Sequence, residues 1–212
     1  MRQSWEQHYK KEKSLLSYPD ENLVRMLALY IREQKNTSDL IAIDLGCGTG
    51  RHLKLLEDFN MKTIGADFSF NALSSCTKAG FKNLINCNNE NLPFKDSSID
   101  IIISWGSLHY CDKDNMIKML SQIHRVLKRG GRLLATLRKD SDTYLKKGKH
   151  IQNNTWITEL GDLKGSVVSF FSQEELKSLF KIFNNVQYGW MERTLIGDVD
   201  KVIAHWVISA EK

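Results

Sequence analysis

Short apolar runs alternate with segments of helical periodicity over the first two thirds of the chain. These runs are almost continuously apolar, which is typical of strands buried on both faces of a parallel sheet. Their alternation with helical segments predicts an α/β fold, with a doubly wound, mostly parallel sheet in a three-layer α/β/α sandwich. The predicted strands are residues 40–45, 62–67, 83–87, 99–104 and 132–137.

Two of the helical segments carry clear boundary signals. Apolar residues recur at steps of three and four over residues 116–127, which predicts a helix with one buried face. The glycine pair at 130–131 is expected to end this helix. Ser172 is followed three positions later by Glu175, a capping box that predicts a helix over residues 173–182.

The C-terminal part of the chain departs from this pattern. Residues 185–192 and 201–210 predict an antiparallel strand pair added to the edge of the sheet. Residues 138–168 show little periodicity between well-patterned elements. Long irregular segments in compact domains are often functional, so we expect a substrate lid loop here, with a variable surface loop as the alternative.

The length of the chain, 212 residues, predicts a single domain. Residues 1–36 precede the first strand and are expected to form an N-terminal helical cap on that domain. The amphipathic start of this segment carries Trp5 and Tyr9. These two aromatic side chains are expected either to close over a bound ligand or simply to pack against the domain.

The composition of the chain excludes some classes of protein but does not indicate an activity. The net charge of +5 tolerates an anionic ligand without requiring nucleic acid as a partner. The start of the chain has no apolar core of the kind found in secretory signals, and no run approaches ~20 uncharged apolar residues. We therefore expect a cytoplasmic protein with reduced thiols, no membrane span and no metal site. The cysteines, whose spacings match no metal or redox motif, are Cys47, Cys76, Cys87 and Cys111.

The first predicted strand runs into a glycine loop, residues 46–50, with the sequence GCGTG. Dinucleotide sites need G-x-G-x-x-G, and the position of the third glycine is occupied by Arg51, which argues against a nicotinamide dehydrogenase. The spacing G-x-G-x-G, with Asp44 two positions before it, resembles the first motif of the class I S-adenosylmethionine-dependent methyltransferases. In that family the loop wraps the methionine half of the cofactor.

Two further segments fit the same resemblance. Asp67 ends the second predicted strand, 21 residues after Gly46, where a carboxylate can accept hydrogen bonds from both ribose hydroxyls. The alternative is that Asp67 caps the helix that follows it. Residues 87–96 resemble the family segment D-A-x-x-L-P-F, which frames the adenine, although Asn88 replaces the usual aspartate. An asparagine is a weaker, uncharged acceptor, and it is alternatively a turn cap.

Residues 99–110 and 125–133 look like the family run F-D-x-V…L-H-H…R-V-L-K-P-G-G-x-L, with Tyr110 for the second histidine and Arg129 for the proline. The resemblance, which is to the methyltransferase type 11 group, implies a Rossmann-like fold. The segments at 147–155, 170–176 and 204–206 are similar to the tellurite-resistance methyltransferase-like group. Members of that group need not share a substrate.

The resemblance implies a cofactor, S-adenosyl-L-methionine, whose product is S-adenosyl-L-homocysteine. It also implies the positions that hold the cofactor, at the glycine loop and at the ends of the strands that follow it. These residues are Asp44, Gly46, Cys47, Gly48, Gly50, Asp67, Phe68, Asn88, Asn89, Ser104 and Trp105.

Methyl transfer to a small-molecule acceptor by in-line displacement is the leading functional hypothesis. Such a reaction needs alignment and exclusion of water, and it needs a general base only when the nucleophile is protonated. His109 and His205 are candidate bases and Arg193 is a candidate for orienting an anion, although each has a purely structural alternative. Basic residues outnumber acidic ones over residues 138–149, which favours an anionic acceptor.

Other interpretations stay open at this point. A methyltransferase that acts on RNA or another nucleic acid is less favoured, because the sequence has no basic module interleaved with base-stacking aromatic residues. A non-catalytic cofactor-binding or interaction protein is suggested only by Asn88 and by the altered segment at 125–131. The C-terminal strand pair is compatible with a monomer or a homodimer.

Overall fold

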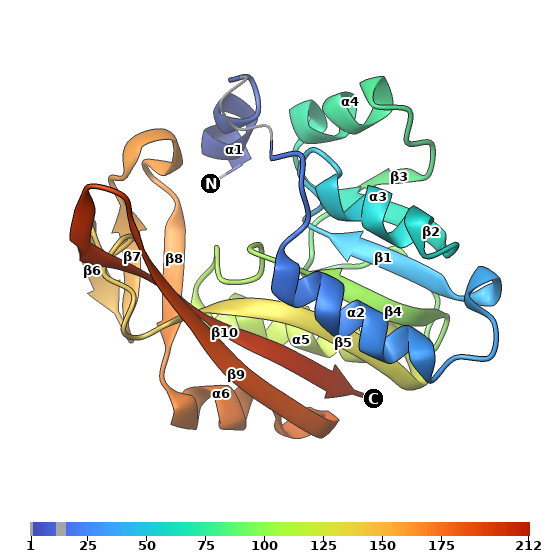
Figure 1. Ribbon diagram of the computed structural model, residues 1–212. Coiled ribbons are helices and arrows are strands. Elements are labelled where there is room, and N and C mark those ends of the chain that lie inside the picture. Colours follow the sequence, from blue (N-terminus) through green and yellow to red (C-terminus); the bar gives the residue numbers. More distant parts are fainter. Residues whose placement is uncertain (1, 12–15) are drawn as a thin grey trace.

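The computed structural model describes residues 2–11 and 16–212, which form a central sheet between layers of helices. The strands of this sheet are β1 (Ile41–Leu45), β2 (Lys62–Asp67), β3 (Leu84–Asn86), β4 (Ile99–Ser104), β5 (Leu127–Lys139), β9 (Asn184–Leu195) and β10 (Asp198–Glu211). The order β3-β2-β1-β4-β5 is parallel throughout, and β10 and then β9 follow β5 as antiparallel neighbours (Figure 1). Both the doubly wound sheet and the antiparallel C-terminal pair are confirmed.

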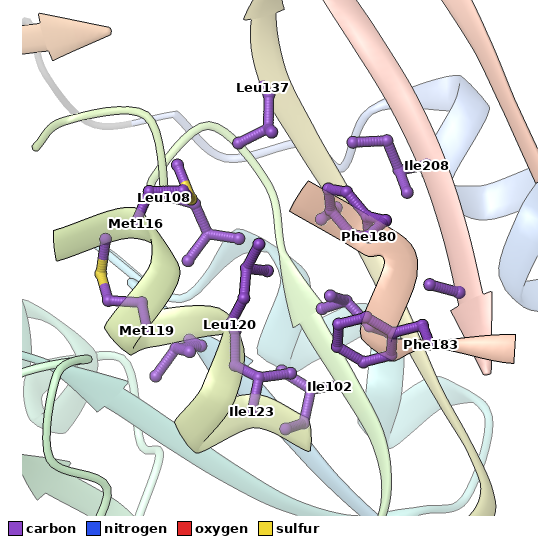
Figure 2. Close-up of a cluster of buried hydrophobic side chains, with 14 of the residues drawn as sticks. Ile102, Leu108, Met116, Met119, Leu120, Ile123, Leu137, Phe180, Phe183 and Ile208 are labelled. Atoms are coloured by element: carbon purple, nitrogen blue, oxygen red, sulfur yellow. The ribbon is translucent and has the colours of Figure 1, made fainter. Parts of the chain in front are cut away.

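Helices cover both faces of the sheet. They are α1 (Arg2–His8), α2 (Glu21–Arg32), α3 (Arg51–Asp58), α4 (Phe70–Lys78), α5 (Lys113–Val126) and α6 (Gln173–Leu179), with short 3₁₀ turns η2 (Thr37–Asp39), η3 (Gly161–Leu163) and η4 (Phe180–Ile182). The apolar faces of α5, α6 and η4 pack around Ile102 and Leu133 on one side, and Figure 2 shows Phe180 and Phe183 in that cluster. The apolar faces of α2 and α3 pack against Ile101 on the other side.

The helix predicted over residues 116–127 ends one residue earlier than expected and is not ended by the glycine pair. Leu127 has an extended backbone, with φ of −63° and ψ of 139°, and it already begins β5. Gly130 and Gly131 lie inside that strand, where the pairing with β4 shifts register between Ile99 and Ile101. A Cβ at Gly131 would lie 2.8 Å from the carbonyl oxygen of Lys128. The glycines therefore allow an irregularity in the strand rather than a helix end.

The segment at 138–168, expected to be an irregular lid loop, is largely a small antiparallel sheet. Its strands are β6 (Gly148–Gln152), β7 (Thr155–Thr158) and β8 (Val167–Phe171). Asn153 and Asn154 form the tight turn between β6 and β7 with left-handed φ values of 46° and 53°. The end of β8 joins the main sheet in parallel through Arg138, whose register partner is Phe170. These strands are too short to show a clear period in the sequence, which is why the segment was expected to be irregular.

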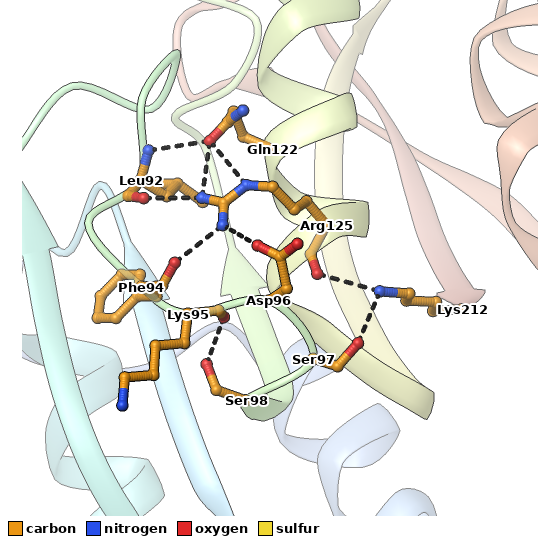
Figure 3. Close-up of polar contacts among 9 residues, drawn as sticks. All are labelled: Leu92, Phe94, Lys95, Asp96, Ser97, Ser98, Gln122, Arg125 and Lys212. Carbon is orange, nitrogen blue, oxygen red and sulfur yellow. Dashed lines mark hydrogen bonds and ion pairs between the residues drawn. The ribbon is translucent and has the colours of Figure 1, made fainter.

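The chain between β3 and β4 is held in place by one side chain of α5. Arg125 donates to the carbonyl oxygens of Leu92 and Phe94, each at 2.9 Å, and contacts the carboxylate of Asp96 at 2.5 Å (Figure 3). Gln122 supports the same guanidinium through its amide oxygen. Arg125 therefore fixes the segment that follows Asn88, which the resemblance assigns to the adenine.

Among residues 2–11 and 16–212, no helix is long and apolar enough to cross a membrane. Within the same residues, no group of three or more histidine, cysteine, aspartate or glutamate side chains is placed to hold a metal ion. The four cysteines are present as free thiols, and all but Cys87 are buried.

We predict that Arg125→Ala lowers the free energy of unfolding by about 2 kcal/mol, because hydrogen bonds to a charged donor are lost and two partly buried carbonyls lose their partner. Urea denaturation followed by circular dichroism measures this change. Arg129→Ala is the matched control, because Arg129 is exposed and is expected to shift stability by less than ~0.5 kcal/mol. Equal effects of the two substitutions would contradict the role assigned to Arg125.

Candidate functional site

A single large cavity of about 1170 Å³ lies at the carboxyl ends of β1, β2, β4 and β5. This is the edge at which open α/β sheets bind their ligands. Pockets for one small molecule usually have volumes of roughly 300–1,000 Å³, so this cavity is larger than the usual pocket for a single ligand. One end is lined by the loops after β1 and β2, and the other by β5, β9 and β10.

The glycine loop forms one wall of the cavity, and its geometry requires glycine. Gly46 and Gly48 have left-handed φ values of 77° and 55°. A Cβ at Gly46 would clash with Ser107, and one at Gly48 would lie 2.8 Å from the hydroxyl oxygen of Tyr9. The amides of Gly46 and Cys47 both donate to the carbonyl oxygen at the end of β2, at 2.7 and 3.1 Å. The loop is therefore pinned to β2 while its surface stays open to a ligand.

The carboxylate of Asp67 faces this loop from the end of β2. Its two oxygens accept hydrogen bonds from the amides of Gly48 and Ser69, each at 2.9 Å. The side chain lines the cavity although it is only 3% exposed. Burial raises the pKa of Asp67 to about 6, against the opposing effect of the two amide donors. The helix cap on α4, which was the alternative role for Asp67, is made by Ser69.

The sequence-predicted cofactor residues divide into two groups. Asp44, Gly50 and Ser104 are not among the lining residues and lie behind the wall. Ser104 donates to the carbonyl oxygen of Leu45 at 3.1 Å, and Asp44 lies 3.7 Å from a ring nitrogen of His52. These three residues shape the wall rather than face a ligand. The residues that do line the cavity are Gly46, Cys47, Gly48, Asp67, Phe68, Asn88, Asn89 and Trp105.

Helix α1 lies beyond the carboxyl ends of the central strands (Figure 1). Its residues Arg2, Trp5 and His8 line the cavity, so the helix forms a roof over it. The carboxylate of Glu6 accepts hydrogen bonds from the amides of Phe70 and Asn71 at the start of α4, at 2.8 and 3.1 Å. On the opposite side, Lys11 forms an ion pair with Asp162 in η3. The roof therefore rests on both sides of the cavity mouth.

The aromatic residues of the expected N-terminal cap both line the cavity, with Trp5 stacked on Tyr9 at 5.9 Å between ring centroids. Burial raises the pKa of Tyr9 well above its usual value. The rest of the expected cap behaves differently. Helix α2 packs on the sheet through Leu23 and Leu27, and residue 1 and residues 12–15 lie outside the described part of the chain.

The rings of His109 and His205 lie close together, with 5.9 Å between their centroids, but only two of the three candidate catalytic residues reach the cavity. His205 and Arg193 line the cavity, from β10 and β9 respectively. His109 is completely buried and is not a lining residue, so its position does not support the general-base role expected for it. Burial, followed by the positive charge of Arg138, lowers the pKa of His109 well below its usual value. The loop after β4 turns His109 inward and presents Tyr110 to the cavity instead.

Several lining residues were not assigned to the site from the sequence. Arg51 was used only to exclude a dinucleotide motif, although its place directly after the glycine loop was a usable signal. Tyr110 was noted only as a departure from the family pattern. Thr136 and Met191 reach the cavity through the register of β5 and β9, which the sequence does not reveal.

Comparisons with known proteins identify a methyltransferase domain. The family profile described as a methyltransferase domain matches residues 43–135. An uncharacterized protein of Methanocaldococcus jannaschii is 37% identical over 164 residues, which cover 76% of this chain and 71% of that protein. The human protein named Probable tRNA methyltransferase 9B is 38% identical over 106 residues, which cover 50% of this chain and 22% of that protein.

The fold agrees with these matches. A crystal structure titled as a SAM-dependent methyltransferase, from Methanosarcina mazei, superposes with a TM-score of 0.72 at 20% identity, covering 88% of this chain and 96% of that one. The chain spans only 55% and 22% of the lengths of the first curated relatives that it matches. These matches support the class I family as a whole and do not single out the tellurite-resistance-like group. The chain therefore contains a methyltransferase domain and has the fold of the S-adenosylmethionine-dependent methyltransferases.

Proposed function

We propose that this protein transfers the methyl group of S-adenosylmethionine to a small-molecule acceptor held at the far end of the same cavity. The observation that carries this proposal is the cavity itself, which joins the glycine loop and Asp67 to a second wall made by β5, β9 and β10. Residues of α1 line this cavity, and such a cover suits a small acceptor better than a large one.

The residues at the glycine-loop end fit the cofactor. The carboxylate of Asp67 is placed to accept from the ribose hydroxyls, and Asn88 and Asn89 line the adenine side. Arg51 opens α3 beside the glycine loop and also lines the cavity. Its guanidinium, together with the free amides at the start of that helix, suits the carboxylate of the methionine half.

When bound, S-adenosylmethionine supplies a methyl group that is already activated on a sulfonium. The protein then has to align the acceptor and keep water out. Trp5 and Tyr9 close the cavity from above, while Tyr110 and Trp105 form apolar walls. No protein group has to take a proton when the acceptor is already an anion or a neutral lone-pair donor.

A nucleic-acid acceptor is the second candidate, and the human relative named as a tRNA methyltransferase favours it. Lys147 and Lys149, beside and on β6, are exposed on the small sheet that joins β5 through β8. If RNA is the acceptor, its affinity should fall steeply as salt is raised, because bound phosphates release counterions. Absence of RNA binding at low salt would remove this candidate.

We predict that S-adenosylmethionine and S-adenosylhomocysteine raise the melting temperature and that NADH does not. A ligand present at ~100 times its Kd adds about 2.7 kcal/mol of stability, which corresponds to roughly 5–10 °C for a chain of this size. Differential scanning fluorimetry measures the shift. A rise with NADH, or no rise with either methionine-derived ligand, would contradict the proposed cofactor site.

We also predict that the affinity for S-adenosylhomocysteine depends on the ionisation of Asp67. Its pKa of about 6 means that the carboxylate is mostly protonated at acidic pH and then loses acceptor capacity. Lowering the pH from 7.5 to 5 should therefore weaken binding about ten-fold, as measured by calorimetry, with a plateau above pH 7.

Asp67→Asn should bind weakly at every pH and lose this dependence. Asp58→Asn is the control, because Asp58 is exposed on α3 and does not line the cavity. The role of the Asp67 carboxylate is excluded if the wild-type affinity stays flat between pH 5 and 7.5.

A further inference from the structure

We propose that the acceptor is a small carboxylic acid whose carboxylate is bound between Arg138 and Arg193, beside His205. This inference rests on the proposed function, because it places the acid at the end of the cavity away from the cofactor. It goes further by naming the chemical class of the acceptor and the residues that select it.

Strand register brings these three side chains to one face of the sheet. His205 on β10 is the register partner of Arg138 on β5 and of Met191 on β9. Arg193 lies two residues after Met191, so it projects from the same face as Met191 does. All four side chains line the cavity.

Arg138 is a fixed cation with a donor to spare. One of its terminal nitrogens donates to Asp142 at 2.6 Å, and Asp142, which is completely buried, also accepts from the amides of Leu145 and Ala204. Arg138 is 8% exposed and lines the cavity beside Tyr110, while its Nε is buried out of reach of the cavity. A carboxylate in the cavity can approach only the part of the guanidinium that Asp142 leaves uncovered, where it would add a second acceptor to this cation.

Arg193 supplies the charge that is not balanced by the protein. It forms no hydrogen bond or ion pair within residues 2–11 and 16–212. Glu192, the neighbouring carboxylate, is bound by Ser141 and lies 3.3 Å from Lys139. The charge of Arg193 also reaches Arg51, where it contributes to lowering the pKa, but Arg51 is assigned to the cofactor carboxylate under the proposed function. Since Asp142 already balances Arg138, the charge of Arg193 is the one left for the acceptor. A monoanion such as a carboxylate matches that charge better than a dianionic phosphate does.

His205 lies in the positive field of Arg138 and Arg193 and adds a neutral hydrogen-bond donor. Burial, followed by the charges of Arg138 and Arg193, lowers the pKa of His205 to about 3. The imidazole is therefore neutral near pH 7 and offers one N–H to an anion. The same field disfavours an ammonium group on the acceptor at this position.

The walls around this subsite are apolar and partly aromatic. The rings of Trp5 and Tyr110 meet edge to face with 4.7 Å between their centroids, and Met191 and Ile203 also line the cavity. These surfaces suit a planar, apolar body attached to the carboxylate. An aromatic acid is therefore the simplest probe of the subsite.

The experiment compares phenylacetate with phenylacetamide, which has the same shape without the charge. Both are titrated by calorimetry into protein saturated with S-adenosylhomocysteine. We expect a millimolar Kd for the acid, as befits so small a ligand, and at least ten-fold weaker binding of the amide. Phenyl phosphate should bind no more tightly than phenylacetate.

Arg193→Gln should abolish the preference for the acid, while Arg129→Gln, on the exposed start of β5, should keep it. A second measurement uses the wild-type protein alone. The ring signals of His205 in nitrogen-15 spectra should shift with phenylacetate and stay unchanged with phenylacetamide. The proposal is overturned if acid and amide bind equally, or if the acid does not bind at about 10 mM.

The calorimetry distinguishes failure of the proposed cofactor site from failure of the proposed acceptor site. If S-adenosylhomocysteine itself gives no binding heat, the proposed methyltransferase site fails. If it binds as expected and phenylacetate does not, only the assignment of a carboxylic acid acceptor fails.

Discussion

The geometry of the cavity depends on how the carboxylate of Asp67 is held. It takes one hydrogen bond from Gly48 and one from Ser69, so it ties the glycine loop after β1 to the start of α4. The loop can approach this closely only because Gly46 and Gly48 carry no Cβ. Burial of the carboxylate raises its pKa, and the two amides keep it available as an acceptor near neutral pH.

Helix α1 and the wall formed by β5, β9 and β10 complete the cavity around Asp67 and the glycine loop. Glu6 places α1 on the first amides of α4, immediately after Ser69, and Tyr9 then meets the glycine loop at Gly48. On the far side, β10 inserts next to β5 and sets His205 opposite Arg138. The proposed cofactor end and the proposed acceptor end of the cavity thus lie together beneath α1. This arrangement suits a reaction in which alignment and exclusion of water do most of the catalysis.

The sequence was most informative where function depends on local chain geometry. The glycine loop and Asp67 follow buried strands at characteristic spacings, so both their place and their proximity were predictable. Strands β6 to β8 were missed because they are short and are stabilised by contacts such as that of Phe170 with the distant Tyr110. The inward turn of His109 and the pairing of Arg138 with His205 depend on loop folding and strand register, which a single sequence does not reveal.

A crystal structure of the protein with S-adenosylhomocysteine would test whether the cavity has these two ends. The account predicts ribose hydroxyls within about 3 Å of the Asp67 carboxylate. It also predicts that the thioether sulfur faces the wall that carries Arg138 and His205. An adenosine bound away from Asp67, or a sulfur turned away from that wall, would contradict the arrangement of cofactor and acceptor described for this cavity.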